Sequence, residues 1–340
     1  MTINVAMVTY DSVVLGCDSL SSVVESMIDV ASSPFALDDQ GREIIDANGD
    51  RCLPFDPSRI RRVTAQVFGG VSKMFPLYEH ESTNVAAVTS GMAFLCGLPI
   101  SELAKTYRQR CRDAHLIFLT VSDVAQSFLA FVREFWEREM RWPQLSDAER
   151  SQLNSVEFLV GGFGQNDAYG RVFRMDVMQR TCVERFTSGN HCGVCWTGQS
   201  EYVERLMMGS DRILQTRVGQ AMKAVMAEQR TQILQRVADD LEEDHIRIPE
   251  RPEHAVAEPA IDLPWFEAIA DIRIGALPIQ YAIDLVSFLV NTQSGMQHFE
   301  SGIATVGGRT HVGYVQRGAR FRPLNELDVL HRNVGYDHEL

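Results

Sequence analysis

The sequence predicts an α+β fold, because strand patterns and helix patterns occur in separate runs along the chain. Two apolar strand-like runs open the sequence, and two helical patterns follow around residues 101–135. Strand patterns return after residue 155, and further helices precede a last strand. Runs of strands separated by paired helices fit a layered α+β arrangement better than a strictly alternating parallel sheet. At 340 residues the chain can bury a full core, and one large domain or two ordinary ones are possible.

The first elements are predicted from alternation and turn residues. Strands are expected at 3–9 and 13–17, joined by the polar turn 10–12. The polar, poorly periodic segment 22–61 is interpreted as an insertion that contains a strong turn signal at 46–50. One small hairpin at 43–52 is expected within it.

The middle of the chain combines strands with two helices. Strand signals recur at 63–68 and 84–88, and the segment 101–111 is helical in character. Ser122 is predicted to cap a second helix. Its apolar face is formed by side chains that recur at helical spacing, namely Val124, Phe128, Phe131, Val132 and Phe135.

The second half returns to strands before it ends in helices and a strand. Strands are predicted at 156–160, 171–177, 182–186 and 192–196. A long helical pattern covers 200–240, and the acidic, proline-bearing stretch 239–264 is interpreted as a second insertion that forms an exposed connector. Pro278 is expected to begin another amphipathic helix, and the last strand is expected at 310–315.

Composition and charge limit the classes of partner and location. The net charge of −13 makes nucleic acid and anionic membranes poor partners. No apolar run reaches the length of a membrane span, and the first residues lack the basic segment of a signal peptide. The odd count of seven scattered cysteines is typical of a reducing compartment. We therefore expect a cytoplasmic protein.

Cys192 and Cys195 have the CxxC spacing of redox pairs and of half zinc sites. They lie within a strand pattern, however, whereas a redox motif begins a helix, and a zinc site needs two further ligands. Small buried cysteines are the better interpretation. We expect no metal and no cofactor.

Thr2 stands directly after Met1 and before the first strand. Once Met1 is removed, its hydroxyl becomes a candidate nucleophile and its own α-amine a candidate base. The alternative is that a threonine at position 2 is common and has no role. Residues further along the chain distinguish a catalytic Thr2 from one without a role.

Nine short segments, taken together and in order, resemble the β-type subunits of the proteasome family, which are N-terminal-nucleophile hydrolases, in the form of a bacterial homologue. The segments are 2–8, 13–19, 72–77, 85–91, 160–164, 172–176, 193–199, 278–282 and 306–308. The resemblance implies a four-layer αββα sandwich, the N-terminal-nucleophile hydrolase fold, as a single domain over 1–340.

The same resemblance implies a catalytic set. Thr2 matches the nucleophile, and Lys73 matches the lysine whose ammonium favours negative charge on the threonine oxygen. Asp18 matches the acid that pairs with Lys73. Gly91 matches the residue whose N–H lines the oxyanion hole, and Thr197 takes the place of a serine that bonds to the α-amine.

Five further positions are implied to line a medium-sized apolar pocket without fixed charge, namely Ser21, Val71, Phe75, Thr89 and Ala93. One element of the family pattern is missing. The third acid before Gly307 and Gly308 has no counterpart, and the nearest acid is Glu300.

The implied function is a threonine endopeptidase, active after removal of Met1, that hydrolyses polypeptides inside a ring-shaped or helical homo-oligomer. The resemblance also implies an ATP-dependent unfoldase as partner. Two alternatives remain open. One is a non-catalytic assembly subunit, which the missing acid favours, and the other is an amidase that acts on small amides.

Overall fold

A computed structural model of the chain describes residues 2–28, 35–38, 40–52, 60–145, 150, 153, 155–187, 191–243, 272–300 and 303–324. The contacts divide the chain into two compact units, Met1–Gln199 with Ile274–Leu340, and Ser200–Arg273. A single domain over 1–340 stays a prediction. Of the second expected insertion, residues 244–264 lie outside the described part, and so does Met1.

The first unit contains a five-stranded sheet in which every pairing is antiparallel. In spatial order its strands are β12 (Gly193–Gly198), β1 (Ile3–Val8), β2 (Ser12–Asp18), β13 (Thr310–Gln316) and β14 (Arg322–Pro323). All residues of β1 and β2 are buried, because this central hairpin is covered on both faces. The expected opening hairpin is thereby confirmed.

A second five-stranded antiparallel sheet has the order β11 (Thr181–Glu184), β10 (Arg171–Asp176), β9 (Val156–Phe163), β6 (Thr83–Gly91) and β5 (Met74–His80). Alternate residues of β6 face opposite sides, as the two-residue period of a strand requires. Val85 and Ala87 belong to the core beneath helices α1 and α2. Ala86 and Val88 pack with residues of β1 and β2 between the two sheets.

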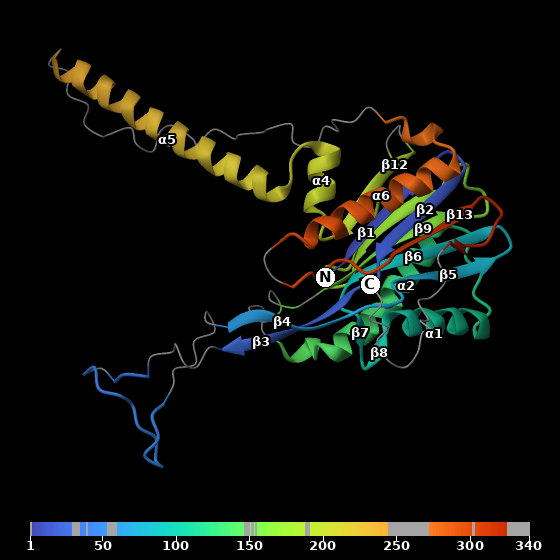
Figure 1. The fold of residues 1–340 in the computed structure, drawn as a ribbon, viewed down its shortest axis with the longest axis horizontal. Helices are drawn as coiled ribbons and strands as arrows, with labels where there is room; N and C mark the ends of the chain where they lie inside the picture. The colour runs from blue at the N-terminus through green and yellow to red at the C-terminus, as the bar shows by residue number, and fades with distance from the viewer. Residues whose placement is uncertain are drawn as a thin grey trace, which may run out of the picture. The chain divides into compact units, whose positions relative to one another are not determined.

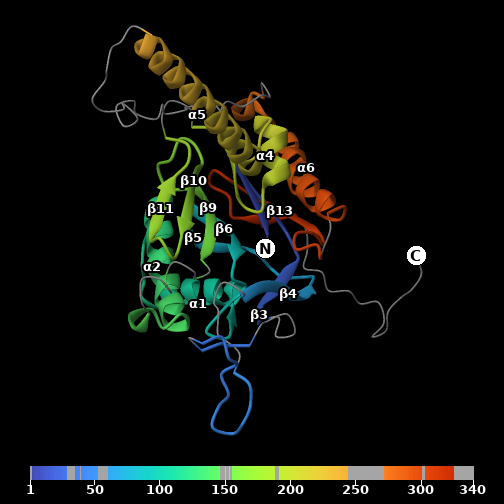
Figure 2. The ribbon, with the colours of Figure 1, turned by 90° about the vertical axis from the view of Figure 1, so that its left-hand side faces the viewer.

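Helices lie against both sheets. Helix α6 (Ile279–Gln297) contacts β1, β2 and β13, while α1 (Ile100–Asp113) and α2 (Val121–Glu139) contact strands of the second sheet (Figure 1, Figure 2). Gly16 permits the close approach of α6, since a Cβ there would overlap the side chain of Val286. The α+β class is confirmed, whereas the N-terminal-nucleophile sandwich stays a prediction.

In the first half, the structure adds strands at the two ends of the expected insertion and corrects one helix cap. Strand β3 (Ser21–Ile28) pairs with β4 (Ile60–Phe68) as a separate two-stranded sheet, so the segment 22–61 begins and ends in strands. Helix α2 is capped by Thr120, whose side chain accepts a hydrogen bond from the Asp123 N–H, and not by Ser122. A short hairpin of β7 (Phe94–Leu95) and β8 (Leu98–Pro99) precedes α1.

The second unit contains α4 (Glu201–Met208) and α5 (Arg212–Glu243). The long helical pattern expected over 200–240 is confirmed, and it forms two helices separated by a short break. Gly209 follows α4 with a φ of 72°, a left-handed conformation that ends a helix. Helix α5 also continues through 239–243, where the connector was expected. Among the helices of the described segments, none is long and apolar enough to cross a membrane.

Candidate active site

Thr2 lies just before β1. It is held there by the backbone of β12 and of Gln199, the residue that follows β12. Its carbonyl oxygen accepts a hydrogen bond of 2.8 Å from the Gln199 N–H. Gly198 pairs with Ile3 in the ladder and has a φ of +85°. A Cβ at Gly198 would overlap the Thr2 carbonyl oxygen. A glycine is thus required here for both reasons, and it fixes Thr2 at the end of the first sheet.

The Thr2 side chain meets Lys73, which precedes β5. The Lys73 ammonium donates a hydrogen bond of 2.6 Å to Thr2 Oγ1 and one of 2.9 Å to Asp18 Oδ1. Thr2 is 4% exposed, Lys73 5% and Asp18 0%. Three residues from separate parts of the sequence therefore form one buried polar cluster.

Asp18, at the end of β2, is surrounded by donors. Its Oδ1 accepts from the Ile3 N–H at 3.1 Å, and its Oδ2 accepts from Leu20 at 3.2 Å and from Gly307 at 3.1 Å. Burial raises the pKa of the Asp18 carboxyl, and the Lys73 ammonium and the Gly307 and Ile3 N–H groups act in the opposite direction. With four donors in place, we treat Asp18 as the carboxylate partner of the Lys73 ammonium.

This arrangement has one chemical consequence for Thr2. An ammonium that donates to Oγ1 stabilises negative charge on that oxygen, and low exposure strengthens the effect. Because Asp18 anchors the ammonium, Lys73 is fixed before any charge develops.

A second polar cluster surrounds Thr197 on β12. Asn4 Nδ2 donates to Thr197 Oγ1 at 3.2 Å, and the hydroxyls of Ser90 and Thr197 are 3.4 Å apart. All three residues are buried. Sequence reasoning missed Asn4 and Ser90, since each is an ordinary polar residue within a strand. The pairing of Asn4 with Thr197 in the β1–β12 ladder brings them together.

Thr305 lies in the segment where the sequence lacks the expected acid. Its hydroxyl donates to Gln199 Oε1 at 2.9 Å, and the Gln199 N–H in turn donates to the Thr2 carbonyl. Glu300 is exposed and accepts a hydrogen bond from Gln297. A neutral Thr305–Gln199 pair, which the sequence did not reveal, thus connects this segment to Thr2.

The five residues predicted to line a substrate pocket lie in several different elements of the fold. The Val71 N–H bonds to the Ser19 carbonyl, and the Thr89 N–H bonds to the Lys73 carbonyl. Ser21 is buried at the start of β3, and Ala93 is partly buried beyond β6. Phe75 is 5% exposed and packs edge-to-face on Phe158 in the core beneath α1 and α2.

Gly91 ends β6 with a φ of +93°, and a Cβ there would overlap the Ser155 carbonyl. The residue is exposed. No hydrogen bond within the described residues connects its N–H to Thr2, so the oxyanion role implied by the resemblance stays a prediction.

The cysteines form no disulfide bonds in the structure. All seven have free thiols, including Cys192 and Cys195. Burial raises the pKa of Cys195 to about 12 and also raises that of Cys192. Within the described ranges, no group of three or more histidine, cysteine, aspartate or glutamate side chains could hold a metal ion.

No protein-family model matches the chain, and no curated protein matches it. Solved structures that are similar include Anbu (ancestral beta-subunit) from Yersinia bercovieri, with 10% identity, a TM-score of 0.45, and 96% of this chain and 88% of that chain covered. The Anbu (Gly-1) mutant from Hyphomicrobium sp. strain MC1 has 10% identity, a TM-score of 0.46 and coverages of 95% and 87%. Anbu from the same strain has 9% identity, a TM-score of 0.41 and coverages of 94% and 86%.

These findings correct the assignment made from sequence. Membership of the proteasome β-type subunit family is not upheld, since no family model matches and the similar structures above are Anbu proteins. At such identities and TM-scores, the likeness assigns neither a family nor an activity to the chain. The function has to be argued from the site itself.

Proposed function

We propose that the chain is a hydrolase of amide bonds in peptides, with Thr2 as an N-terminal nucleophile. The observation that supports this most directly is the 2.6 Å hydrogen bond from the Lys73 ammonium to Thr2 Oγ1, anchored by Asp18 at 2.9 Å. A buried cation aimed at a threonine hydroxyl stabilises the alkoxide that nucleophilic attack requires.

The reaction requires a free α-amine on Thr2, and therefore cleavage of the Met1–Thr2 bond. The amine, whose ordinary pKa is about 7.7–8.0, accepts the hydroxyl proton through a water molecule. Oγ1 then forms a bond to the scissile carbonyl carbon, and the C–N bond breaks as the amine proton passes to the leaving nitrogen. Water hydrolyses the resulting ester and restores the Thr2 hydroxyl.

Other residues have positioning roles in this proposal. Lys73 stabilises the developing charge on Oγ1, and the Gly91 N–H is assigned to the carbonyl oxyanion. Thr197, which contacts Asn4 and Ser90, is assigned the hydrogen bond to the α-amine. The fold we propose is the helix–sheet–sheet–helix arrangement of N-terminal-nucleophile hydrolases, supported by α6 on one sheet and by α1 and α2 on the other.

Mass spectrometry and covalent labelling test the nucleophile together. We expect an intact mass without Met1 and a single adduct with an electrophile selective for N-terminal threonine. The Thr2→Ala variant should form no adduct, while the conservative Thr2→Ser variant should retain labelling. Adduct formation that survives Thr2→Ala, or in protein that retains Met1, would contradict the proposed nucleophile.

A second candidate is an amidase for small substrates. It is favoured by the 4% exposure of Thr2, which leaves little room for a polypeptide next to the hydroxyl. Digestion of unfolded casein together with aminoacyl anilides supports the peptidase. Hydrolysis of the anilides alone, abolished by Thr2→Ala, supports the amidase.

We further propose that copies of the chain associate through α6. Tyr281 and Phe288 lie seven residues apart on this helix and are 64% and 54% exposed, although α6 also packs on the first sheet. Large exposed apolar side chains at helical spacing are typical of interfaces. Sedimentation velocity should show an oligomer that Phe288→Ser dissociates. The matched change Phe94→Ser, at a residue 45% exposed on β7, should leave the oligomer intact.

An unfoldase partner and a cytoplasmic location stay predictions.

A further inference from the structure

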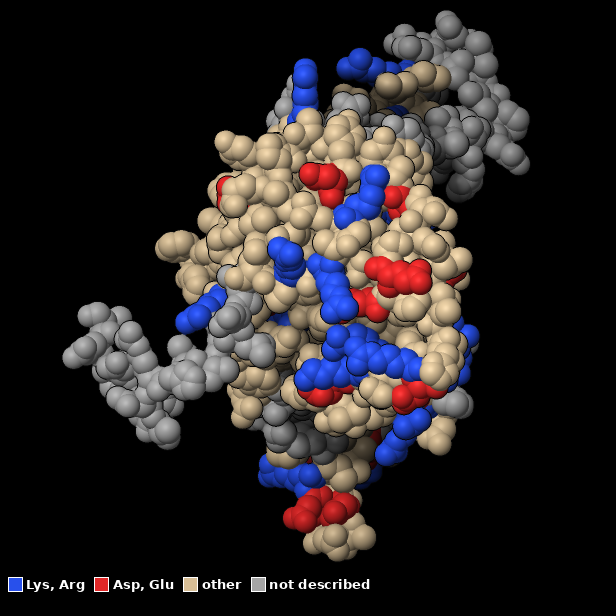
Figure 3. Space-filling model, turned by 90° about the vertical axis from the view of Figure 1, so that its right-hand side faces the viewer, with Lys and Arg blue, Asp and Glu red and all other residues tan. Residues whose placement is uncertain are grey.

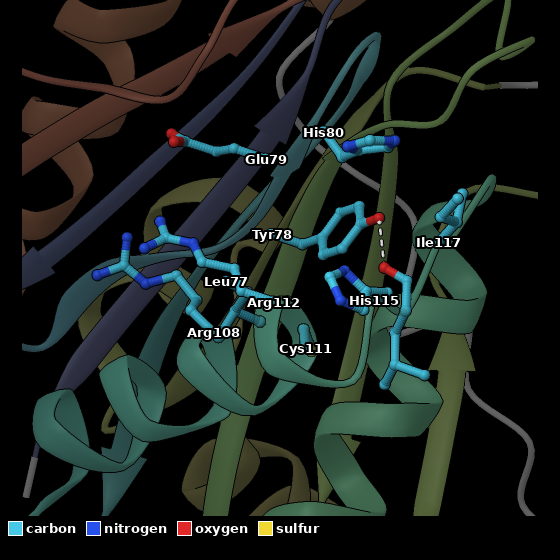
Figure 4. A pocket seen from close by; sticks show the side chains of 10 residues that line it. Leu77, Tyr78, Glu79, His80, Arg108, Cys111, Arg112, His115 and Ile117 are labelled. Carbon is cyan, nitrogen blue, oxygen red and sulfur yellow. Dashed lines mark hydrogen bonds between the residues drawn. The ribbon is translucent and has the colours of Figure 1, made fainter.

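A hollow of about 270 Å³ lies between β5, the C-terminal half of α1 and the residues that follow α1 (Figure 4). Its residues are not part of the cluster around Thr2. Two arginines one helical turn apart, Arg108 and Arg112, line it together with Leu77, Cys111 and Ile117. The hollow therefore combines positive charge with an apolar surface.

Among the described residues, neither arginine forms an ion pair. Arg108 Nε is buried and has no hydrogen-bond partner. Glu79 also lines the hollow, yet no ion pair among the described residues connects it to Arg108 or Arg112. Like charges at i and i+4 of a helix repel each other, and an unsatisfied buried donor costs free energy. An anion between the guanidinium groups would remove both costs.

At its opposite end the hollow has the apolar side chain of Ile117, together with His80 and His115. In Figure 4 the two guanidinium groups extend to one side, and Ile117 lies on the other side with His115 and Tyr78 between them. Ile117 is 65% exposed. The wall is fixed in place, because Tyr78 Oη donates to the Leu116 carbonyl at 3.1 Å and accepts from the Phe118 N–H at 3.0 Å.

We infer that this hollow binds an amphipathic anion, which places a carboxylate or phosphate between Arg108 and Arg112 and its apolar part along Leu77 and Ile117. Arginine suits such groups, since its planar fork donates two parallel hydrogen bonds to an oxyanion. The volume, slightly below the range of drug-sized pockets, suits a short chain or a single ring. Figure 3 shows Lys and Arg side chains close together, with acidic side chains among them, on one face of this acidic chain.

Isothermal titration calorimetry with sodium octanoate tests the inference on the full chain. We expect octanoate to bind, inorganic phosphate to bind more weakly, and octylamine, which has the opposite charge, not to bind. Arg108→Gln and Arg112→Gln should each weaken octanoate binding by about tenfold or more, as loss of a charge-assisted hydrogen bond does. Ile117→Ser should weaken octanoate binding and leave phosphate binding unchanged.

Arg110→Gln is the matched control, because Arg110 lies on the same helix and is paired with Glu134 at 3.4 Å. It should leave octanoate binding unchanged. Equal weakening by Arg110→Gln would show a general charge effect and overturn the inference. The inference is also overturned if neither octanoate nor phosphate binds. A third contrary result is self-association that Arg108→Gln abolishes without any octanoate binding, since an acidic surface of a second copy would then occupy the hollow.

Discussion

At the scale of single residues, the Lys73–Asp18 pair is a buried ion pair that costs desolvation free energy. Both side chains are almost fully buried, with exposed fractions of 6% and 0%. Removing two charges from water costs several kcal/mol per ion, and the pair repays this only if hydrogen bonds satisfy it. Asp18 has three N–H donors besides Lys73, and Lys73 has Thr2 as a further acceptor. The pair is therefore held in one geometry.

The first prediction follows from this burial. Lys73→Met should lower the free energy of unfolding by about 3–5 kcal/mol, because it leaves the Asp18 charge buried and uncompensated. The double variant Lys73→Met with Asp18→Asn should recover part of this loss while remaining inactive, because the amide nitrogen cannot accept the backbone N–H bonds of the oxygen it replaces. Urea unfolding of the two single variants and the double variant checks this. A double variant that is less stable than either single one would show that the pair does not act as a unit.

Gly198 gives a second prediction at this scale. Gly198→Ala should abolish labelling of Thr2, since the new Cβ would overlap the Thr2 carbonyl oxygen. Gly97→Ala is the matched control, with a φ of +74° and open space around its Cβ position. It should cost only the strain of a left-handed residue, about 1–2 kcal/mol. Equal loss of labelling in both variants would mean that strain, not the overlap, is responsible.

At the scale of elements, the site depends on how the segment before β13 reaches Thr2. Thr305→Val should lower kcat by about 10–100-fold, because Gln199 loses the donor that orients it and Thr2 shifts. KM should change little. Thr305→Ser keeps the hydroxyl and should restore the rate. A loss of rate that Thr305→Ser does not restore would assign Thr305 a packing role only.

The sequence predicts elements well where a strand or helix has one clear period. Strands β1, β2, β9 and β13 have apolar runs that end at turns, and each was predicted within a few residues. β3 was missed because its polar alternation resembles that of a loop, and its partner β4 lies over thirty residues later. The α2 boundary was misplaced by two residues, since both Thr120 and Ser122 are good caps and only the backbone decides between them.

The candidate site shows the same limit. Thr2, Asp18 and Lys73 were predicted from the sequence, and the structure brings them together. Asn4, Ser90, Gln199 and Thr305 were not, because hydrogen bonds between neutral side chains on distant strands have no sequence pattern. Gln199 is 106 residues from Thr305, and only the folded chain relates them.

At the scale of the whole molecule, burial separates the seven thiols by reactivity. Burial raises the pKa of Cys17 and Cys195 to about 12, so only about 10⁻⁴ of either is thiolate at pH 8. Iodoacetamide at pH 8 should therefore modify Cys52, which is partly exposed, and leave Cys17 and Cys195 unmodified. In urea all seven should react. Peptide mass mapping of both samples checks this, and modification of Cys17 in the native protein would contradict the buried hairpin.

If Thr2 acts as the nucleophile proposed above, the hydrogen bond from the Gly307 N–H to Asp18 bears on when its site can be complete. The two residues are 289 positions apart. At about 5–20 residues translated per second, roughly 15–60 s separate the appearance of Asp18 from that of Gly307. During synthesis the nucleophile leaves the ribosome among the first residues, while the last group that fixes its neighbouring carboxylate is still untranslated. Under the proposed function, the hydrogen bonding around Asp18 is therefore complete only after Gly307 has been translated.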